Sequence, residues 1–291
     1  MSEVRFRDTG PFDPDVVWAR MRIIRDEGRI TLKFGEMDYH LSMTGGVVEA
    51  LSELDGKVLA YPIRDITDSA LIRESIASSL AEGATTAYDR AEMMLLGNDP
   101  PKDRSERMIR NNHDAMRFVR DNHEGPLTLE FILAVHRIIT KGILDDGYSG
   151  RFRDNDSVVV QDAITGEVSH QPIPCVQIEA AVQGLCDFIN DDGMLHPVLK
   201  GIILHYAIVF IHPFKDGNGR VERCLFYRCG FRGGYRALEH LSLSEYIRDH
   251  KGRYERSYIF GETDGNDMTY FVLYNLMALS STIDETVMMT E

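Results

Sequence analysis

The chain has 291 residues, with 46 Asp and Glu against 32 Lys and Arg, which gives a formal net charge of −14. An acidic chain lacks the concentrated positive surface that nucleic acid and anionic lipid require, so this balance argues against both as main partners. Hydrophobic residues make up 43% of the chain and charged residues 27%, values typical of a globular protein rather than a disordered one.

The N-terminal third predicts a mixture of helices and a hairpin. Apolar residues recur with helical spacing over residues 13–27. Residues 29–43 alternate polar and apolar side chains around Gly-Glu-Met-Asp, which is typical of a small hairpin. One helix follows over residues 44–54 and another over residues 69–82, where Gly83 can end it in a left-handed conformation.

The middle of the chain is predominantly helical. Amphipathic helices are predicted over residues 104–121, 128–141 and 176–190. Between the last two, a β-branched run at 157–161 and a short segment at 168–171 flank a turn that contains glycine. We therefore expect an isolated hairpin in helical surroundings.

A segment that is apolar nearly all round, residues 198–211, predicts a helix buried at the centre of a bundle. A second helix is expected from Gly219 to about Gly230, after a short loop. Asp267 can cap a last helix, and the final residues 284–291 are expected to fray. The predicted fold class is mainly α: a helical bundle with one hairpin, preceded by a smaller N-terminal region with a hairpin of its own.

The loop between the two central helices, residues 212–223, reads HPFKDGNGRVER. The proline ends the buried helix and leaves His212 at its rim as a candidate base. Gly217 and Gly219 flank Asn218 and permit positive φ, which exposes successive N–H groups. These donors lie at the start of the next helix, whose dipole also favours an anion.

Charged side chains complete this loop. Arg220 and Arg223 are three residues apart, so both guanidinium groups lie on one face of the helix. Asp216 can hold a Mg²⁺ that bridges phosphate oxygens. Each feature alone is more often structural, as a capping histidine, an ordinary turn or a solvated helix face. Their coincidence in one loop predicts a polyphosphate site with a base beside it.

The loop resembles the signature of the Fic family, H-x-F-x-(D/E)-G-N-G-R-x-x-R, with every specified position filled. The likeness extends through IRNNHDAM upstream and LSLSEYIRDHKGRYERSY downstream. It implies an N-terminal region at 1–104, a Fic catalytic core at 105–281 and a C-terminal tail at 282–291. It also implies a Fic-type helical bundle in which the hairpin at 157–171 is a flap beside the active site.

Most members of this family transfer AMP from ATP to a hydroxyl of a protein Ser, Thr or Tyr. The resemblance thus implies a protein adenylyltransferase that uses ATP as substrate and Mg²⁺ as cofactor, with His212 as the base and Asp216 as the metal ligand. It assigns phosphate binding to Lys215, Gly217, Asn218, Gly219, Arg220 and, at the γ-phosphate, Arg223, and it places Tyr254 near the adenine. Phe214 is expected to be a packing anchor of the loop.

The flap suggests how a target protein is held. Its strand edge, at Val158, Val159, Val160 and Gln161, can pair with an extended target segment through main-chain hydrogen bonds. The alternative is a structural hairpin that only covers the core.

A second resemblance concerns regulation. Ser78 and Glu82 lie four residues apart on one face of the helix at 69–83. The segment SSLAEG resembles the inhibitory motif of the family, (S/T)-x-x-x-E-(G/N), including Gly83. By this resemblance Glu82 pairs with Arg223 and takes the place of the γ-phosphate, so the enzyme is autoinhibited. Alanine precedes Glu82 where many relatives have a larger apolar residue, so we expect looser docking of this helix.

The sequence leaves alternatives open. A Fic enzyme that uses another nucleotide, or that removes AMP from a modified target, fits the same loop. A nucleotide-sensing interaction module is disfavoured because it needs no base beside its phosphate site. A metal site from His196, His205 and His212 is disfavoured because their spacings of nine and seven differ from the i, i+4 pair of a helix.

The expected partners are ATP and a target protein that carries a hydroxyl side chain, with auto-modification as a further outcome. Four cysteines without a C-x-x-C pair, no apolar leader in the first ten residues and no run of about 18 apolar residues predict a cytoplasmic protein. The target, the role of residues 1–60 and the oligomeric state stay open, a homo-oligomer included. Residues 212–236 hold six Lys and Arg and two Asp and Glu, a local net charge of +4, which predicts a small basic site in an acidic body.

Overall fold

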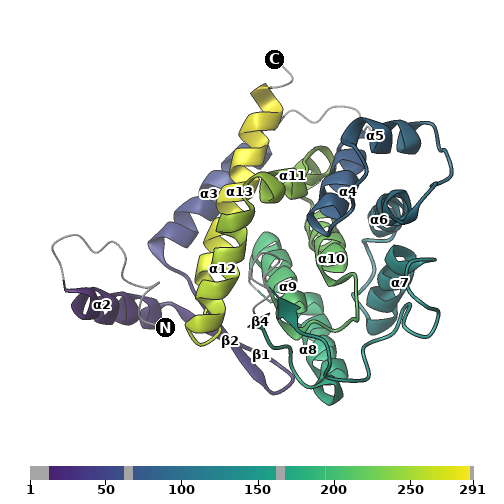
Figure 1. Cartoon of the computed structure of the whole chain (residues 1–291). Helices are drawn as coiled ribbons and strands as arrows, with labels where there is room; N and C mark the ends of the chain where they lie inside the picture. The colour runs from purple at the N-terminus through teal and green to yellow at the C-terminus, as the bar shows by residue number, and fades with distance from the viewer. Residues whose placement is uncertain (1–12, 62–67, 162–167, 194, 289–291) are drawn as a thin grey trace.

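A computed structural model describes residues 13–61, 68–161, 168–193 and 195–288 (Figure 1). Helices dominate these residues, and their strands form two separate antiparallel pairs. The predicted fold class, mainly α with one hairpin in the bundle and one in the N-terminal region, is confirmed. Among the described residues, no helix is both long enough and apolar enough to span a membrane.

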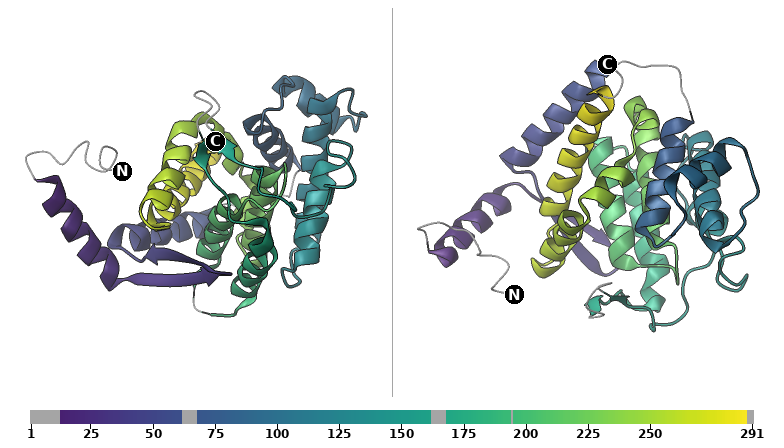
Figure 2. Two further views of the ribbon diagram at one scale, coloured as in Figure 1. Left: turned by 60° about the horizontal axis from the view of Figure 1, so that its bottom comes forward. Right: turned by 45° about the horizontal axis from the view of Figure 1, so that its top comes forward.

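The N-terminal elements lie along one side of the molecule (Figures 1 and 2). They are α2 (Pro14–Glu27), β1 (Arg29–Phe34), β2 (Met37–Ser42) and α3 (Gly45–Ala60). The hairpin turn is shorter than expected, because Gly35 adopts a φ of 62° and lets the two residues after Glu36 join β2. Thr44 caps α3, which runs six residues past the predicted end.

On the opposite side lie the helices that precede the central pair (Figure 1). They are α4 (Ser69–Ala81), α5 (Tyr88–Leu96), α6 (Arg104–Asp121) and α7 (Leu129–Thr140). The bounds of α4, α6 and α7 agree with the prediction to within one residue. The helix α5 was not predicted; it has nine residues and buries only Ala91, Met94 and Leu95.

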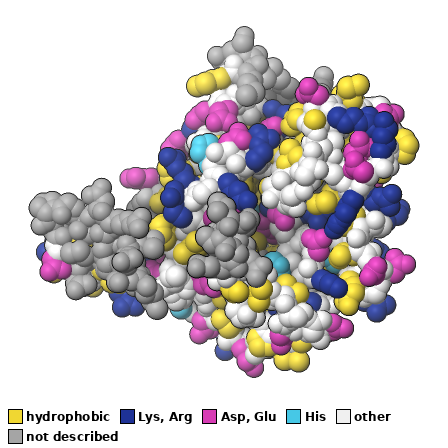
Figure 3. Space-filling view, in the orientation of Figure 1, with side chains coloured by type: hydrophobic (Ala, Val, Ile, Leu, Met, Phe, Trp, Pro, Cys, Tyr) yellow, Lys and Arg dark blue, Asp and Glu magenta, His cyan; other side chains and the backbone are white. Residues whose placement is uncertain are grey.

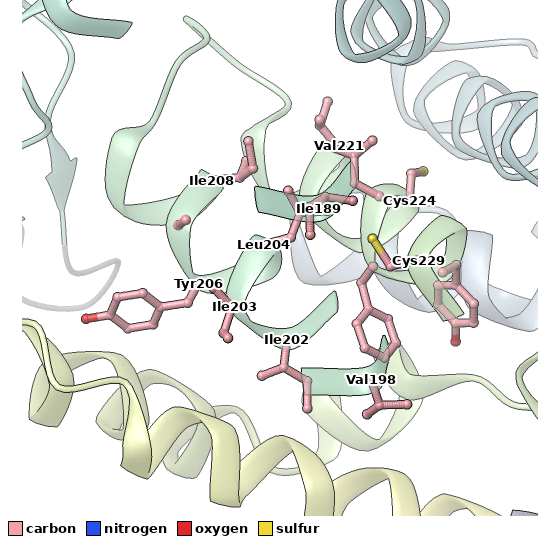
Figure 4. Close-up of a cluster of buried hydrophobic side chains, with 14 of the residues drawn as sticks. Ile189, Val198, Ile202, Ile203, Leu204, Tyr206, Ile208, Val221, Cys224 and Cys229 are labelled. Carbon is pink, nitrogen blue, oxygen red and sulfur yellow. The ribbon is translucent and has the colours of Figure 1, made fainter. Parts of the chain in front are cut away.

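Two antiparallel helices occupy the middle of the molecule, α9 (Pro197–Ile211) and α10 (Asn218–Arg232). Their side chains meet in a buried cluster that includes Ile202 and Ile203 of α9 and Val221 and Cys224 of α10 (Figure 4). The continuous apolar run of α9 is explained by this position, because the helix is covered on every side. The helix α8 (Ile178–Asn190), which follows a short 3₁₀ turn at Cys175–Gln177, packs against α9.

The predicted flap is present in part. The strand β3 (Val160–Gln161) pairs with β4 (Val168–His170) through an irregular register. Val158 and Val159 precede β3 and are half-buried, so the strand is shorter than expected. The predicted turn at 162–167 lies outside the described residues.

The C-terminal segment corrects two expectations. Its elements are a 3₁₀ turn at Arg236–His240, α11 (Leu243–Asp249), α12 (Lys251–Thr263) and α13 (Thr269–Met288). The segment LSLSEYIRDHKGRYERSY, which resembles one helix that follows the motif in the Fic family, forms two helices with a break at His250. The frayed end expected from residue 284 is helical as far as Met288, where α13 lies against α3 and Asp284 pairs with Lys57 at 2.6 Å.

Candidate active site

The loop at 212–223 begins with a left-handed residue. His212 ends α9 with φ of 48° and ψ of 60°, and its N–H still donates to the Ile208 carbonyl at 2.9 Å. This conformation, rare for a residue with a side chain, turns the backbone sharply out of the helix. The imidazole therefore lies where the buried helix meets the loop.

Asn218 closes the loop on itself. Its Oδ1 accepts a hydrogen bond from the Phe214 N–H at 2.9 Å, and its Nδ2 donates to the Phe214 carbonyl at 2.8 Å. Gly217 adopts a φ of 87° and lets α10 start directly behind it. The side chain of Asn218, predicted to bind phosphate, is thus occupied within the loop, and its part in anion binding would come from the backbone.

A histidine outside the loop motif packs against the loop and forms a hydrogen bond with its backbone. His136 of α7 is fully buried and stacks on Phe214, with ring centroids 3.8 Å apart and an interplanar angle of 7°. Its Nδ1 accepts from the Gly150 N–H at 2.9 Å, so its Nε2 carries the proton and donates to the Asp216 carbonyl at 3.0 Å. Burial lowers the pKa of His136 to about 4, so this support is uncharged at neutral pH. Phe214 is the packing anchor that the sequence predicted.

Arg153 links the loop to the flap, and nothing in its local sequence, RFRDND, marks it. Its side chain is buried, and its Nε donates to the His212 carbonyl at 3.0 Å. One Nη donates to Asp156 at 2.8 Å, ahead of β3, and the other donates to the Ile173 carbonyl, behind β4. Both ends of the flap are therefore tied to the candidate base.

The electrostatic setting keeps His212 neutral. Burial, the largest cause, lowers the pKa of His212 to about 4. The carbonyl of Val209 and the carboxylate of Glu82 act in the opposite direction, and the nearby His170 and Arg153 act in the same direction as burial. At neutral pH the imidazole is thus available to accept a proton.

Arg220 is a buried cation with free donors. The side chain is fully buried, and one Nη faces Asp216 Oδ1 at 3.4 Å. Among the described residues, its Nε and other Nη have no hydrogen-bond partner. Burial lowers the pKa of this guanidinium. Because a buried donor without an acceptor is costly, the arrangement suits an anionic ligand outside the protein.

Arg223, by contrast, is surrounded by partners. Its Nε donates to Ser78 Oγ at 2.8 Å, and one Nη donates to Glu82 Oε1 at 2.9 Å. The other Nη donates to Glu222 Oε1 at 3.1 Å. Burial alone would lower the pKa of Arg223, but the charges of Glu82 and Glu222 outweigh it and raise the pKa. The contact that the sequence predicted between the end of α4 and the second loop arginine is present.

The carboxylate of Glu82 lies directly against the start of α10. A Cβ atom added to Gly219 would lie 2.7 Å from the Glu82 Cδ and would overlap its Oε1. Gly83 adopts a φ of 87°, as predicted, and ends α4 just behind Glu82. An anion from the protein itself thus occupies the space over the backbone that the dipole of α10 favours.

The helix that carries Glu82 is firmly packed. Nine of the thirteen residues of α4 are buried, among them Glu74 and Ser78. Glu74 accepts hydrogen bonds from the Tyr227 hydroxyl at 3.0 Å, the Ser242 hydroxyl at 3.1 Å and the Ser244 N–H at 2.9 Å. These contacts fix α4 along most of its length, and the looser docking expected from Ala81 relative to other members of the family stays a prediction.

The remaining predicted residues are dispersed around this centre. Asp216 is 38% exposed, and its Oδ2 lies 3.6 Å from the Nη of Arg104, so it presents a carboxylate oxygen toward solvent. Lys215 is exposed, with its Nζ 3.7 Å from the centroid of the Tyr148 ring. Tyr254 directs its hydroxyl inward to Glu222 at 3.2 Å. The carboxylate of Asp216, beside a guanidinium that has donors without a partner among the described residues, fits a divalent cation with a phosphate group.

Comparison with known proteins agrees with this geometry. Residues 126–229 match the model of the Fic/DOC family. The protein adenylyltransferase Fic of Drosophila willistoni is 34% identical over 111 residues, which are 38% of this chain and 20% of that protein. The first three such relatives are matched over only 20–24% of their own length.

Solved structures show the same fold. A crystal structure of a Fic family protein from Desulfovibrio desulfuricans superposes with a TM-score of 0.74 and 25% identity, over 86% of this chain and 76% of that chain. A Fic domain containing signaling protein from Bacteroides thetaiotaomicron has the same fold, with a TM-score of 0.65 at 21% identity over 84% of this chain and 96% of that chain. Residues 126–229 thus match the Fic/DOC family within a chain that has a Fic-type helical fold and a distant likeness to the protein adenylyltransferases Fic.

Proposed function

We propose that this protein is an autoinhibited protein adenylyltransferase that transfers AMP from ATP to a Ser, Thr or Tyr hydroxyl of a target protein. One observation carries the proposal: the Glu82 carboxylate lies over Gly219 and binds Arg223, in the anion site beside a neutral His212. The distant kinship with protein adenylyltransferases supports the chemistry.

The free donors of the site suit the phosphates of ATP. Among the described residues, the Nε and one Nη of Arg220 have no partner, and the N–H of Gly219 lies at the start of α10. Arg223 would bind the γ-phosphate once Glu82 has left. Asp216 would hold Mg²⁺, which when bound neutralises charge on the phosphate oxygens.

His212 would take the proton of the target hydroxyl as the oxygen attacks the α-phosphorus. The new O–P bond forms as the bond between the α-phosphorus and its bridging oxygen breaks, and pyrophosphate leaves. Arg220 and the N–H groups at the start of α10 hold the phosphates in place, so positioning and charge stabilisation supply most of the acceleration. The flap, tied to the His212 carbonyl through Arg153, would present the target segment.

Glu82 inhibits in this account by occupying the γ-phosphate position. Its carboxylate and the phosphate cannot both lie beside Arg223. A triphosphate that enters the site would be displaced from the in-line geometry, so binding would survive better than transfer.

Labelled ATP tests the reaction. The Glu82→Gly variant is incubated with Mg²⁺ and ATP that carries the label on the α- or the γ-phosphorus, and the other nucleoside triphosphates are run in parallel. We expect covalent label on protein from the α-labelled ATP only, and none when His212→Ala is added. Label from the γ-phosphorus, or equal transfer without His212, would contradict the proposal.

The reverse reaction is a second candidate, because Glu82 is 31% exposed and stands in the anion site near His212, where it can orient a water molecule. AMP-modified protein offered to the unmutated chain would lose AMP in this case, and the Glu82→Gly variant would not remove it. A modified substrate that stays intact in both reactions would exclude this candidate.

A further inference from the structure

Arg223 contacts two carboxylates, and they differ in character. Glu82 contacts Arg223 from the end of α4 with a side chain that is 31% exposed. Glu222, its neighbour on α10, is 1% exposed and binds the other Nη at 3.1 Å. One carboxylate can move into solvent, and the other cannot.

Glu222 is fixed by a set of buried donors in addition to Arg223. The Nε2 of His205 lies 2.8 Å from its Oε2, and the hydroxyls of Tyr254 and Tyr258 donate to its two oxygens at 3.2 Å each. Withdrawing Glu222 would leave these groups without an acceptor in the core, which is costly. Glu222 therefore stays on Arg223 whether Glu82 is present or not.

We propose that Glu222 is a permanent counter-carboxylate of Arg223, a positioning residue that also sets the preference of the site between triphosphate and diphosphate. The inference rests on the proposed function, since it takes Arg223 as the ligand of the γ-phosphate. It concerns a position that the Fic signature leaves unspecified.

The positioning follows from the hydrogen bonds. When Glu82 leaves, Arg223 keeps Ser78 on its Nε and Glu222 on one Nη. The Nη released by Glu82 also keeps its hydrogen bond to the Ser78 carbonyl at 3.2 Å, so the guanidinium is held in one orientation and one N–H is free for a new partner. The site needs no rearrangement of Arg223 to accept a phosphate.

The preference follows from charge. Glu222 cancels part of the positive field of Arg223, and it repels any anion that replaces Glu82. A terminal phosphate carries a charge of about −1.5 to −2 at neutral pH, against −1 for a carboxylate. Repulsion by Glu222 therefore reduces the binding free energy of the phosphate more than that of the Glu82 carboxylate. Glu222 therefore favours Glu82 over the γ-phosphate as the partner of Arg223. It also lowers the affinity for ATP relative to that for ADP, which has no phosphate at this position.

The test measures nucleotide affinity rather than catalysis. The full chain with Glu82→Gly serves as background, so that competition by Glu82 does not enter. Dissociation constants for Mg²⁺-ATP and Mg²⁺-ADP are measured by calorimetry in this background alone, and with Glu222→Gln, Tyr258→Phe or Arg223→Ala added. The quantity of interest is Kd(ADP)/Kd(ATP).

We expect Glu222→Gln to raise this ratio by about tenfold, because it removes a charge beside Arg223 and keeps the side-chain shape. Tyr258→Phe removes one hydrogen bond from the same carboxylate but no charge, so its ratio should change by less than about twofold. Arg223→Ala should lower the ratio. Should Glu222→Gln fail to fold, Glu222→Asp draws the carboxylate back from Arg223 and should raise the ratio by about threefold.

Two results would overturn the inference, and they are distinguishable. If Arg223→Ala lowers the ratio but the Glu222 variants leave it unchanged, the role of Glu222 is wrong and the phosphate site stands. If Arg223→Ala leaves the ratio unchanged, Arg223 does not bind the γ-phosphate, and the proposed function fails with the inference.

Discussion

Two histidines with the same lowered pKa, one fully buried and one half-buried, have different surroundings at the loop. His136 uses both ring nitrogens to hold Gly150 and the Asp216 carbonyl, so it is a support. His212 lies at the rim, half-buried, between α9 and the anion site. Only His212 is placed to exchange a proton with a substrate, although burial gives both a pKa of about 4.

Replacing the candidate base tests this distinction. His212→Ala should reduce transfer by about a thousandfold, because the target hydroxyl loses its proton acceptor. The Kd for Mg²⁺-ATP should change little, since His212 is not among the proposed phosphate ligands. His40→Ala, on the N-terminal hairpin, is the matched control and should leave both quantities unchanged. Undiminished transfer by His212→Ala would remove it as the base.

The pH dependence of transfer should report the buried setting of His212. The base acts when neutral, so kcat/KM falls as the pH drops through its pKa, about 4 rather than the usual 6.5. A profile of kcat/KM for the Glu82→Gly variant should therefore be flat from about pH 7 to 5.5. An acidic limb centred near pH 6.5 would show that His212 is not buried as described.

The residues of the site could be predicted from the sequence only where a motif specifies them. His212, Asp216 and Arg223 are close in the chain, because the first two lie in one loop and Arg223 lies in the second turn of the helix that follows it. His136 and Arg153 were not predicted, because they reach the loop from α7 and from an irregular segment, and neither has a periodic pattern. Such contacts depend on the tertiary fold rather than on spacing along the chain.

Among the elements, α4 is held in the core along most of its length, and the residue that follows it, Glu82, is partly exposed. Glu74 accepts hydrogen bonds from Tyr227, Ser242 and Ser244 in the core. Glu82, just past the last helical residue, makes its ion pair with Arg223 at the edge of the site. The proposed inhibition would then be relieved by movement of Glu82 alone, with the helix in place.

Unfolding experiments separate these two glutamates. Glu74→Ala should lower the free energy of unfolding by about 3 kcal/mol, because it leaves several buried donors without an acceptor. Glu82→Ala should lower it by less than about 1 kcal/mol, since its carboxylate is partly solvated. Urea denaturation of both variants measures the difference. Equal losses would mean that Glu82, like Glu74, is part of the core.

Elements with a strong pattern were predicted well, and short elements were not. The amphipathic α6 and the predominantly apolar α9 agree with their predicted bounds to within a residue. The break at His250 and the helical end of α13 were missed, because a two-helix corner and a contact with Lys57 of α3 are decided by neighbouring elements. Local sequence does not record these contacts.

At the scale of the whole molecule, the N-terminal hairpin and the catalytic region share one core. Tyr39 of β2 packs edge-on against Tyr206 and Phe210 of α9, with centroid distances of 6.3 Å and 5.4 Å. The hairpin thus contributes to packing of the helix that ends at His212.

Basic and acidic side chains are interspersed over the face in Figure 3, rather than gathered in one acidic surface.

Three buried histidines should make stability depend on pH. Burial lowers the pKa of His113, His136 and His212 to about 4 in the folded protein, against about 6.5 in an unfolded chain. Between these values the unfolded state binds more protons, so the free energy of unfolding falls as the pH is lowered from 6.5 to 4. Above pH 6.5 these groups are neutral in both states, so they no longer make the free energy of unfolding depend on pH.

Denaturation at a series of pH values measures this effect, and His136 alone should account for about 3 kcal/mol over the window. His113→Leu removes one of the three groups, so the free energy of unfolding of this variant should depend on pH less steeply, by the equivalent of up to one bound proton. A slope that His113→Leu leaves unchanged would show that this histidine is already charged when folded.

The most direct test of autoinhibition is the intact mass of the protein after incubation with Mg²⁺-ATP. We expect the Glu82→Gly variant to gain the mass of AMP at least about tenfold faster than the unmutated chain, because Arg223 is then free for the γ-phosphate. Glu82→Gly combined with His212→Ala should gain none. A Glu82→Gly variant that binds ATP yet stays as unmodified as the original chain, alone and with a target protein, would show that Glu82 does not inhibit transfer.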